Sequence, residues 1–550
     1  MSGAPDPAPA APLRPPRGRV ALALLLIVLV AAAARFHGLD FGGRLPYARP
    51  DENRVAGQAA RLLAGEWRPA SFAYPALVPL AHVGVRQVAR ALGLEEASDA
   101  GELAAGYRAG RIVSATAGVA TVLLLFALVR RRRSAGEALL AAGLLALAHL
   151  HVRDSHFGVT DTPLAAATTA FLLLLTATSE WPRARRFALC GAALGMAAAV
   201  KQTAVFAALP LLVEAFAATP AERPLGGRPL RVRLGRAAAA LLLAAGCAAA
   251  TFLLINPFAL LEPERFLSDV LFELGHKTEA GGPLAQRGFV THATFTLRHG
   301  LGLPFAIAAA LGLLLCAWRA RRADAIVLLF AAAYYLGMGN GTRTFVRYMV
   351  PLVPLAALFA ARTLVACGAL APARLRPLAI VAAAAALLAP STASVVASDR
   401  LLAARDSRLL MADALAERIG PNERVAWIGR YSWPPETPAD PRLERRDAAW
   451  LAERLPAGVD AGEALRTAGF DWVVVADHWL RSPFDAKPEQ VARLAAALDE
   501  VATFGPLAEG RARADVAPLF DRFDFLYLPY ARFDGVARPG PFLRLFRCRR

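Results

Sequence analysis

Long apolar runs constrain the fold of this chain more than any other feature. Its 550 residues are 56% hydrophobic, a larger share than soluble domains usually have. Runs of about 17 or more mostly apolar residues are long enough to cross a bilayer as helices. The sequence therefore predicts a polytopic α-helical membrane protein with about 11 transmembrane helices, near residues 20–37, 107–129, 135–150, 162–178, 187–200, 203–218, 237–255, 301–318, 324–339, 346–366 and 377–397.

Clusters of arginine between these runs predict how the chain is oriented. The formal net charge is +18, but the positive residues are spread over the connections, so we expect no nucleic-acid partner. If the N-terminus is cytoplasmic, every cluster falls on the cytoplasmic side, as the positive-inside rule requires. Residues 38–106 and the chain after about residue 398 then lie outside, and the number of spans is odd. The clusters are Arg14, Arg17 and Arg19; Arg130 to Arg133; Arg183, Arg185 and Arg186; Arg223, Arg228, Arg231, Arg233 and Arg236; Arg319, Arg321 and Arg322; and Arg374 and Arg376.

The sequence divides into three expected domains. Residues 1–16 are rich in Pro and Ala and predict a disordered cytoplasmic N-terminus. Residues 17–397 form the transmembrane catalytic domain, whose long first outer loop, 38–106, contains two amphipathic segments suited to the membrane interface. Residues 398–550 are more polar and predict an extracytoplasmic α/β domain. Within it we expect helices over 407–418 and 490–498 and strands over 425–428, 472–475 and 542–546.

Two other features limit the interpretation of this chain. Residues 20–34, which follow three arginines, also fit the core of a signal peptide, whose removal would leave the first loop outside all the same. The chain has 5 cysteines. Four of them lie in or beside predicted spans, and none forms a CxxC pattern. The cysteines therefore indicate neither a disulfide framework nor a thiolate metal site.

An acidic pair, Asp51-Glu52, follows the first apolar run by about a dozen residues and is the first candidate catalytic group. A carboxylate at the outer mouth of a membrane protein can take a proton from an acceptor hydroxyl there. The pair also suits a helix start, because Asp after Pro50 is a good N-cap and acidic residues favour the first helical turn. The two interpretations are compatible.

A polar turn over residues 149–163 is the second candidate. It contains Arg153, His156 and Asp161 within a short stretch between two spans. A carboxylate at membrane depth is costly unless it is paired, which favours a functional role for Asp161. His156 and Asp161 are candidate metal ligands together with neighbouring histidines, and interfacial hydrogen bonding is the alternative for the histidines. No cofactor is certain, and a divalent cation remains open.

Isolated cations on the predicted outer side are the third candidate. Lys201 ends one span, in a chain whose only other lysines are Lys277 and Lys487. Its compact ammonium suits a phosphate, although it also suits simple snorkelling to the interface. Arg343 and Arg347 lie on the side that should be poor in positive charge, where they suit either a lipid phosphate or headgroup contact.

Four stretches carry a resemblance when they are taken in order. They are Pro50-Asp51-Glu52 followed by Tyr74-Pro75, Val159-Thr160-Asp161-Thr162-Pro163, Lys201-Gln202-Thr203-Ala204, and Phe345-Val346-Arg347-Tyr348-Met349-Val350-Pro351. Together they resemble bacterial GT-C glycosyltransferases of the protein O-mannosyltransferase and aminoarabinose-transferase-like group (glycosyltransferase family 39 type). The likeness covers roughly residues 18–397.

The resemblance implies transfer of one sugar from a polyprenyl-phosphate carrier to an acceptor hydroxyl on the outer face of a bacterial inner membrane. The acceptor is a lipid, a glycan or a protein. Asp51 would be the base, with Glu52 beside it, and Asp161 would organise the site or a cation. Lys201 and Arg347 would neutralise the leaving phosphate, and the remaining substrate-binding candidates are Tyr74, Arg153, His156, Arg343 and Tyr348.

One departure and two rival functions accompany this resemblance. Aminoarabinose transferases carry a Glu-Lys pair before a Pro-Pro, whereas this chain has Ala73-Tyr74-Pro75-Ala76, so the phosphate contact supplied there is missing. A transporter or lipid flippase would explain the spans but not the long first outer loop or the outer α/β domain. An oligosaccharide ligase or polymerase would share the membrane chemistry but hand over a whole glycan.

Overall fold

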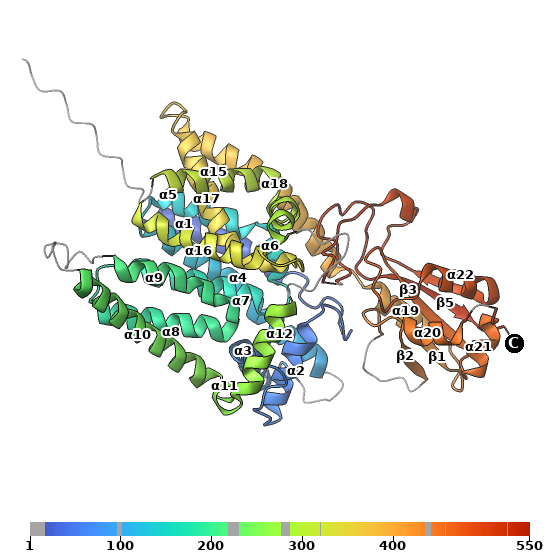
Figure 1. Cartoon of the computed structure of the whole chain (residues 1–550). Helices are drawn as coiled ribbons and strands as arrows, with labels where there is room; N and C mark the ends of the chain where they lie inside the picture. Colours follow the sequence, from blue (N-terminus) through green and yellow to red (C-terminus); the bar gives the residue numbers. More distant parts are fainter. Residues whose placement is uncertain are drawn as a thin grey trace, which may run out of the picture.

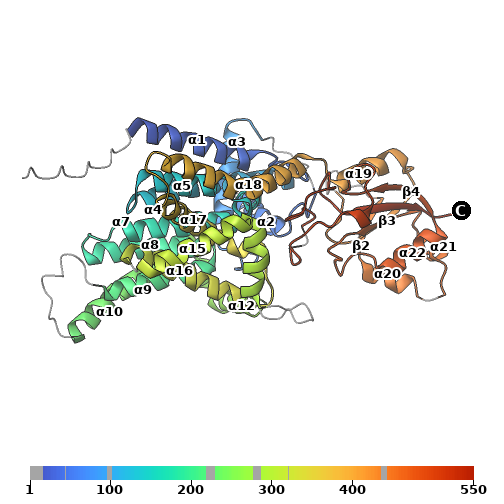
Figure 2. The same ribbon diagram turned by 90° about the horizontal axis from the view of Figure 1, so that it is seen from above.

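A computed structural model of the chain has two parts, a large helical body and a smaller α/β body at one end of it (Figures 1 and 2). It describes residues 17–43, 45–95, 102–217, 230–276, 287–319, 321–434, 442–456, 458–524 and 526–549. The expected disordered segment 1–16 lies outside these residues. The sheet and its helices occupy the part that the sequence predicted as α/β.

A helix occupies each of the apolar runs that the sequence predicted as spans. Among the described residues, five helices are long and apolar enough to cross a membrane, or six if one helix pair bent by 118° is a single span. The chain is therefore a multi-pass membrane protein, and the total of about 11 spans remains a prediction. The helices are α1 (Arg17–Phe36), α4 (Glu102–Arg130), α5 (Ala135–Ala146), α7 (Asp161–Ala177), α8 (Arg183–Val200), α9 (Ala208–Phe216), α10 (Leu230–Ile255), α15 (Leu303–Arg319), α16 (Arg322–Gly339), α17 (Val353–Gly368) and α18 (Arg376–Ala403).

Several shorter helices join them. The first outer loop contains α2 (Glu52–Leu63) and α3 (Leu77–Ala91), the two helices that its apolar spacing predicted, and the polar turn contains α6 (His149–Asp154). Four more helices precede α15: α11 (Phe258–Leu261), α12 (Pro263–His276), α13 (Gly288–Thr291) and α14 (Arg298–Leu301). The 118° bend lies between α14 and α15, at Gly302, whose φ of 84° is a conformation that glycine adopts at little cost.

Two apolar runs begin with a tighter 3₁₀ turn instead of α-helix. These turns are η2 (Gln202–Ala207), just after Lys201, and η5 (Val346–Leu352), which contains Arg347. Such irregular backbone at membrane depth is tolerated only where protein covers it or where it lines a cavity. Both breaks therefore mark the region in which a site is expected.

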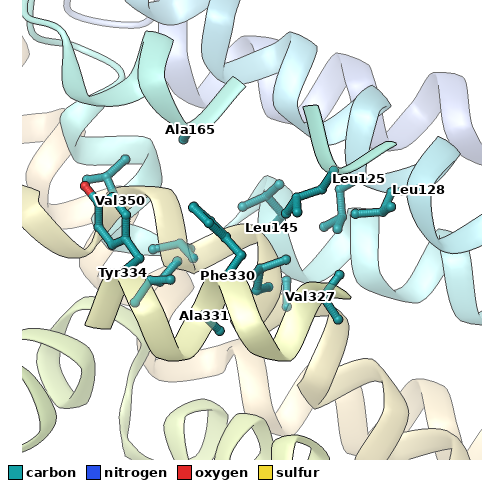
Figure 3. Close-up of a cluster of buried hydrophobic side chains, with 14 of the residues drawn as sticks. Leu125, Leu128, Leu145, Ala165, Val327, Phe330, Ala331, Tyr334 and Val350 are labelled. Atoms are coloured by element: carbon teal, nitrogen blue, oxygen red, sulfur yellow. The ribbon is translucent and has the colours of Figure 1, made fainter. Parts of the chain in front are cut away.

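The core of the helical body is apolar and closely packed. Figure 3 shows Leu125 and Leu128 of α4, Leu145 of α5 and Phe330 of α16 turned toward one another, and all four are buried. Burying such side chains contributes roughly 1.5–3 kcal/mol each in water. Within a bilayer, close approach of backbones matters more, and Gly191 and Gly195 of α8 lie directly against Ala244 and Ala248 of α10.

Buried ion pairs join several of the arginine-rich connections at one end of the bundle. Arg133 pairs with Asp324 at 2.6 Å, and Glu214 accepts from both Arg186 and Arg322 at 2.7 Å. These connections therefore lie close together, as the positive-inside pattern requires of connections on one side. Figure 1 shows the start of α1 and the start of α10 at the end away from the α/β body.

The α/β body is built on a five-stranded sheet of order β2-β1-β3-β5-β4. Strand β1 pairs parallel with β2 and β3, whereas β5 pairs antiparallel with β3 and β4. Helix α19 packs on one face of the sheet, and the other three helices pack on the opposite face. The elements are α19 (Ser407–Arg418), β1 (Val425–Ile428), β2 (Leu443–Arg446), α20 (Ala448–Arg454), α21 (Ala461–Thr467), β3 (Trp472–Asp477), α22 (Pro488–Ala497), β4 (Asp499–Phe504) and β5 (Phe542–Arg547).

The sequence predicted α19, β1, β3, α22 and β5, and the structure confirms them. It did not predict β2 and β4, because each is an edge strand with charged or exposed residues and lacks the apolar pattern of a buried strand. Between β4 and β5 the chain returns to the helical body. There Leu526 and Leu528 join a buried cluster with Phe41, Leu45 and Phe157.

Candidate active site

A cavity of about 480 Å³ opens where the first outer loop, α7, η2, α12 and η5 meet. Its charged side chains are Asp51, Asp161, Lys201 and Arg347, called here the charged wall, together with Glu273 of α12. The rest of the lining is mainly apolar and includes Phe206, Phe252, Phe266, Val270, Leu274 and Met338, called here the apolar wall. Four polar residues from distant parts of the chain thus converge beside a surface suited to a lipid tail, which is the arrangement expected of a ligand site.

Asp51 stands at the N-cap position of α2 and Glu52 lies in its first turn, as the helix-start interpretation predicts. Asp51, however, makes no capping hydrogen bond with its side chain. Its φ is 73°, in the left-handed region that a residue other than glycine occupies only at a cost of about 1–3 kcal/mol. The carboxylate instead accepts from Arg347 Nη2 at 2.9 Å and keeps 22% of its side chain exposed. Strain of this kind occurs at functional sites more often than elsewhere.

Arg347 is the centre of the charged wall. Its guanidinium donates to Asp51 through Nη2 and to Asp524 through Nη1, and its Nε lies 3.8 Å from Asp161. The side chain is 10% exposed, and its guanidinium carbon lies 3.9 Å from the centre of the Phe345 ring. A charge this buried is tolerated because each edge of the planar group faces a carboxylate.

Lys201 supplies a second cation beside the first. Its backbone is extended between α8 and η2, and its ammonium donates to Asp161 at 2.7 Å. The ammonium also lies 5.6 Å from the centre of the Tyr348 ring. Asp161 is the first residue of α7 rather than its cap, and it lies between the two cations of the cavity.

The surroundings keep Asp51 ionised. Burial alone would raise the pKa of this carboxyl, but the positive charges of Arg347, Arg49, Arg54 and Lys201 outweigh burial and hold the pKa below its usual value. Tyr74, which also lines the cavity, behaves in the opposite way. Burial and the charge of Asp51 raise its pKa well above the usual value, so it stays a neutral hydroxyl.

Four predicted site residues do not line the cavity. Glu52 accepts from Arg111 at 2.7 Å and from the Gly158 amide at 2.7 Å, so it ties α2 to α4 and to the polar turn. Arg153 pairs with Asp154 at 2.9 Å and is fully buried. Both ring nitrogens of His156 lie within 3.0 Å of the backbone carbonyl groups of Val152 and His37. Arg343 also lies outside the lining.

The structure offers no support for a metal centre at these positions. Within the described ranges, no group of three or more His, Cys, Asp or Glu side chains is arranged to hold a metal ion. Lys201 already pairs with one oxygen of Asp161, and backbone carbonyls take both nitrogens of His156.

The tail contributes two acidic residues that sequence reasoning missed. Asp521 accepts from the Val346 amide at 2.9 Å, and Asp524 contacts Arg347 and lies 2.8 Å from Arg49. Both are almost fully buried. Their signal was the stretch Phe520-Asp521-Arg522-Phe523-Asp524, in which two acids stand among aromatic residues, since a buried acid needs a partner.

Asp521 gives a prediction about pH. Burial, with a smaller contribution from Asp524, raises its pKa from 3.8 to about 7. The folded state therefore disfavours the charged form, and stability is lost as pH rises from about 4 to about 7. We expect Asp521→Asn to raise the melting temperature in detergent at pH 8 and to leave it nearly unchanged at pH 4. An equal change at both pH values would contradict this account, and the exposed Asp534→Asn is the control.

A family model covers part of the helical body. Residues 104–246, from α4 through most of α10, match the model PMT_2, described as dolichyl-phosphate-mannose-protein mannosyltransferase. This segment contains Asp161 and Lys201 of the charged wall. A comparison with curated protein sequences gives no match.

Solved structures share the fold over most of the chain. ArnT from Cupriavidus metallidurans bound to undecaprenyl phosphate is 17% identical, with a TM-score of 0.52 over 88% of this chain and 96% of that one. The oligosaccharyltransferase of Archaeoglobus fulgidus is 13% identical, with a TM-score of 0.53 over 84% of this chain and 70% of that one. The resemblance seen in the sequence is thus confirmed over residues 104–246 by the PMT_2 model, and the fold over most of the chain is that of ArnT.

Proposed function

We propose that this protein moves a single sugar from a polyprenyl-phosphate-linked donor to an acceptor hydroxyl on the outer face of a bacterial inner membrane. The observation that carries the proposal is the charged wall. Asp51, strained and ionised, lies 2.9 Å from Arg347 in the cavity that Lys201 also lines. A base and two cations in one cavity are what this transfer needs.

The proposed reaction is a single displacement at the anomeric carbon. The acceptor oxygen forms the new bond to that carbon, and its proton passes to an oxygen of Asp51. The bond from the anomeric carbon to the phosphate oxygen breaks, and its electron pair leaves with the phosphate. Arg347 and Lys201 stabilise the charge that grows on that oxygen. One displacement of this kind inverts the anomeric centre.

The apolar wall supports a lipid-borne donor. Its phenylalanines and aliphatic side chains face the same cavity as the two cations, so a chain of isoprene units and its phosphate are both accommodated by chemistry. The solved structures of the same fold include ArnT bound to undecaprenyl phosphate and an Archaeoglobus fulgidus enzyme in complex with a dolichol-phosphate.

The experiment that tests this function is a comparison of lipid extracts from cells with and without the gene. We expect a polyprenyl phosphate carrying one sugar to accumulate when the gene is deleted, identified by its mass. Accumulation of a lipid-linked oligosaccharide would favour a ligase instead. An unchanged profile of lipid-linked sugars would contradict the proposal and leave a transporter as the better account.

The same proposal includes an orientation. We infer about 11 spans, a cytoplasmic N-terminus, and a C-terminal α/β domain on the outer side, because the arginine-rich connections then face the cytoplasm. A reporter fused after Arg550 should therefore be active only if it works in the periplasm or its equivalent. A matching fusion before Arg17 is the control and should show the opposite side. A cytoplasmic signal after Arg550 would contradict the orientation.

A further inference from the structure

The segment between β4 and β5 supplies a carboxylate that contacts Arg347 of the charged wall. Asp524 has 1% of its side chain exposed, and all its contacts run through one oxygen, to Arg347 Nη1 and to Arg49 Nη1. The neighbouring Asp521 holds the amide of Val346, the residue before Arg347. The ring centres of Phe523 and Phe345 lie 6.0 Å apart. The segment between β4 and β5 thus contacts η5 and the residue before it through three side chains, Asp521, Phe523 and Asp524.

Asp524 also reaches the loop that carries the proposed base. Arg49 is fully buried and donates to the carbonyl of Pro50 at 2.5 Å, next to Asp51. One oxygen of Asp524 therefore joins Arg347, which pairs with Asp51, to Arg49, which lies two residues before Asp51 in the chain. Any shift of Asp524 would move the base and its cation relative to each other, and displacements of about 1 Å in a catalytic group can cost ~10²-fold in rate.

Charge balance gives Asp524 a second effect. Around the cavity, Lys201, Arg347 and Arg49 pair with Asp51, Asp161 and Asp524, and Glu273 also lines the cavity. Removing the charge of Asp524 makes the surroundings of Asp51 more positive. This added positive charge would attract a lipid phosphate more strongly, but it would also make Asp51 a weaker base.

We propose that Asp524 is a positioning residue of the transfer reaction, which holds Arg347 and Arg49 in place and balances their charge so that Asp51 stays aligned and basic. This inference rests on the proposed function. It predicts opposite effects on two measurements, since turnover falls while affinity for a polyprenyl phosphate is kept or increases. A purely structural residue would lower both.

The test uses the full chain in detergent and in vesicles. Asp524→Asn keeps the shape of the side chain and removes its charge. We expect turnover of lipid-linked donor, extracted from the deletion strain, to fall at least about tenfold, with a Kd for undecaprenyl phosphate equal to or lower than that of the wild type. The exposed Asp534→Asn, ten residues further along the same segment, is the matched control and should behave as wild type.

A double variant separates charge from packing. Arg49→Gln removes one of the two cations that Asp524 balances, so Asp524→Asn combined with Arg49→Gln should recover part of the lost turnover. If the two losses were independent, they would simply add in the double variant.

Three outcomes would each overturn the inference. They are turnover of Asp524→Asn within twofold of wild type, weakened binding of undecaprenyl phosphate, and additive losses in the double variant. If Asp51→Asn is inactive while Asp524→Asn is normal, only this inference fails. If the wild type itself transfers no sugar, the proposed function is contradicted, whatever Asp524→Asn does.

Discussion

Asp51→Asn should lower the rate of sugar transfer by about 10²–10⁴-fold while the protein still inserts and folds. The amide keeps the size of the side chain and a hydrogen-bond acceptor for Arg347, but it cannot take the proton of the acceptor hydroxyl. The measurement is the initial rate of transfer in reconstituted vesicles, normalised to the amount of folded protein. Near-normal transfer would rule out Asp51 as the base.

Two controls belong with this variant. Asp40→Asn changes an exposed carboxylate of the same loop, 69% exposed and paired with the surface residue Arg108, and should leave the rate unchanged. Glu52→Gln should act on stability, because it leaves Arg111 buried without its ion pair, a loss that costs about 3–5 kcal/mol. The folded fraction of Glu52→Gln should then transfer sugar far better than Asp51→Asn.

Removal of either cavity cation should impair use of the lipid-phosphate donor. Lys201→Ala should raise the donor KM, because Lys201 lines the cavity, where its ammonium pairs with Asp161. Arg347→Ala should lower kcat as well, by about 10²-fold or more, because it also leaves Asp51, Asp161 and Asp524 without the cation they share. Initial rates over a range of donor concentrations separate the two effects.

Conservative variants sharpen this prediction. Lys201→Arg should rescue only part of the donor affinity, since a planar fork does not replace a compact ammonium. Arg347→Lys should fold more readily than Arg347→Ala, since it keeps one charge among three carboxylates. Lys487→Ala, in the α/β body, is the control. Donor kinetics of wild-type quality in both alanine variants would mean that the phosphate is held elsewhere.

Much of the fold could be predicted because its signals are local. Apolar length predicts a helix wherever it lies, and the positions of α2, α3 and α19 followed from helical spacing. The edge strands β2 and β4 were not predicted, because their residues are charged or partly exposed and lack the apolar pattern of a buried strand. The 3₁₀ turns η2 and η5, at the starts of two apolar runs, were not predicted either. Their backbone depends on the cavity that they line rather than on their own sequence.

The candidate site could be predicted only in part, and the acidic pair shows why. Asp51 and Glu52 are neighbours of similar chemistry, yet one faces the cavity and the other is buried against Arg111. That difference comes with the left-handed backbone at Asp51, a conformation that aspartate adopts more often than most residues but that the local sequence does not predict here. Asp524 was not found in the sequence for another reason. Its partners, Arg49 and Arg347, lie far away in sequence, and only the return of the chain between β4 and β5 brings them together.

If Asp524 positions the site as proposed, the same return of the chain sets when the site is complete during synthesis. The base is made among the first residues, the two cavity cations follow, and the acid that joins Arg49 to Arg347 emerges only after residue 520. A nascent chain that ends before Asp524 still lacks the carboxylate that joins these two arginines. A donor lipid therefore meets the charged wall in its final arrangement only once Asp524 has been made and this segment has folded back.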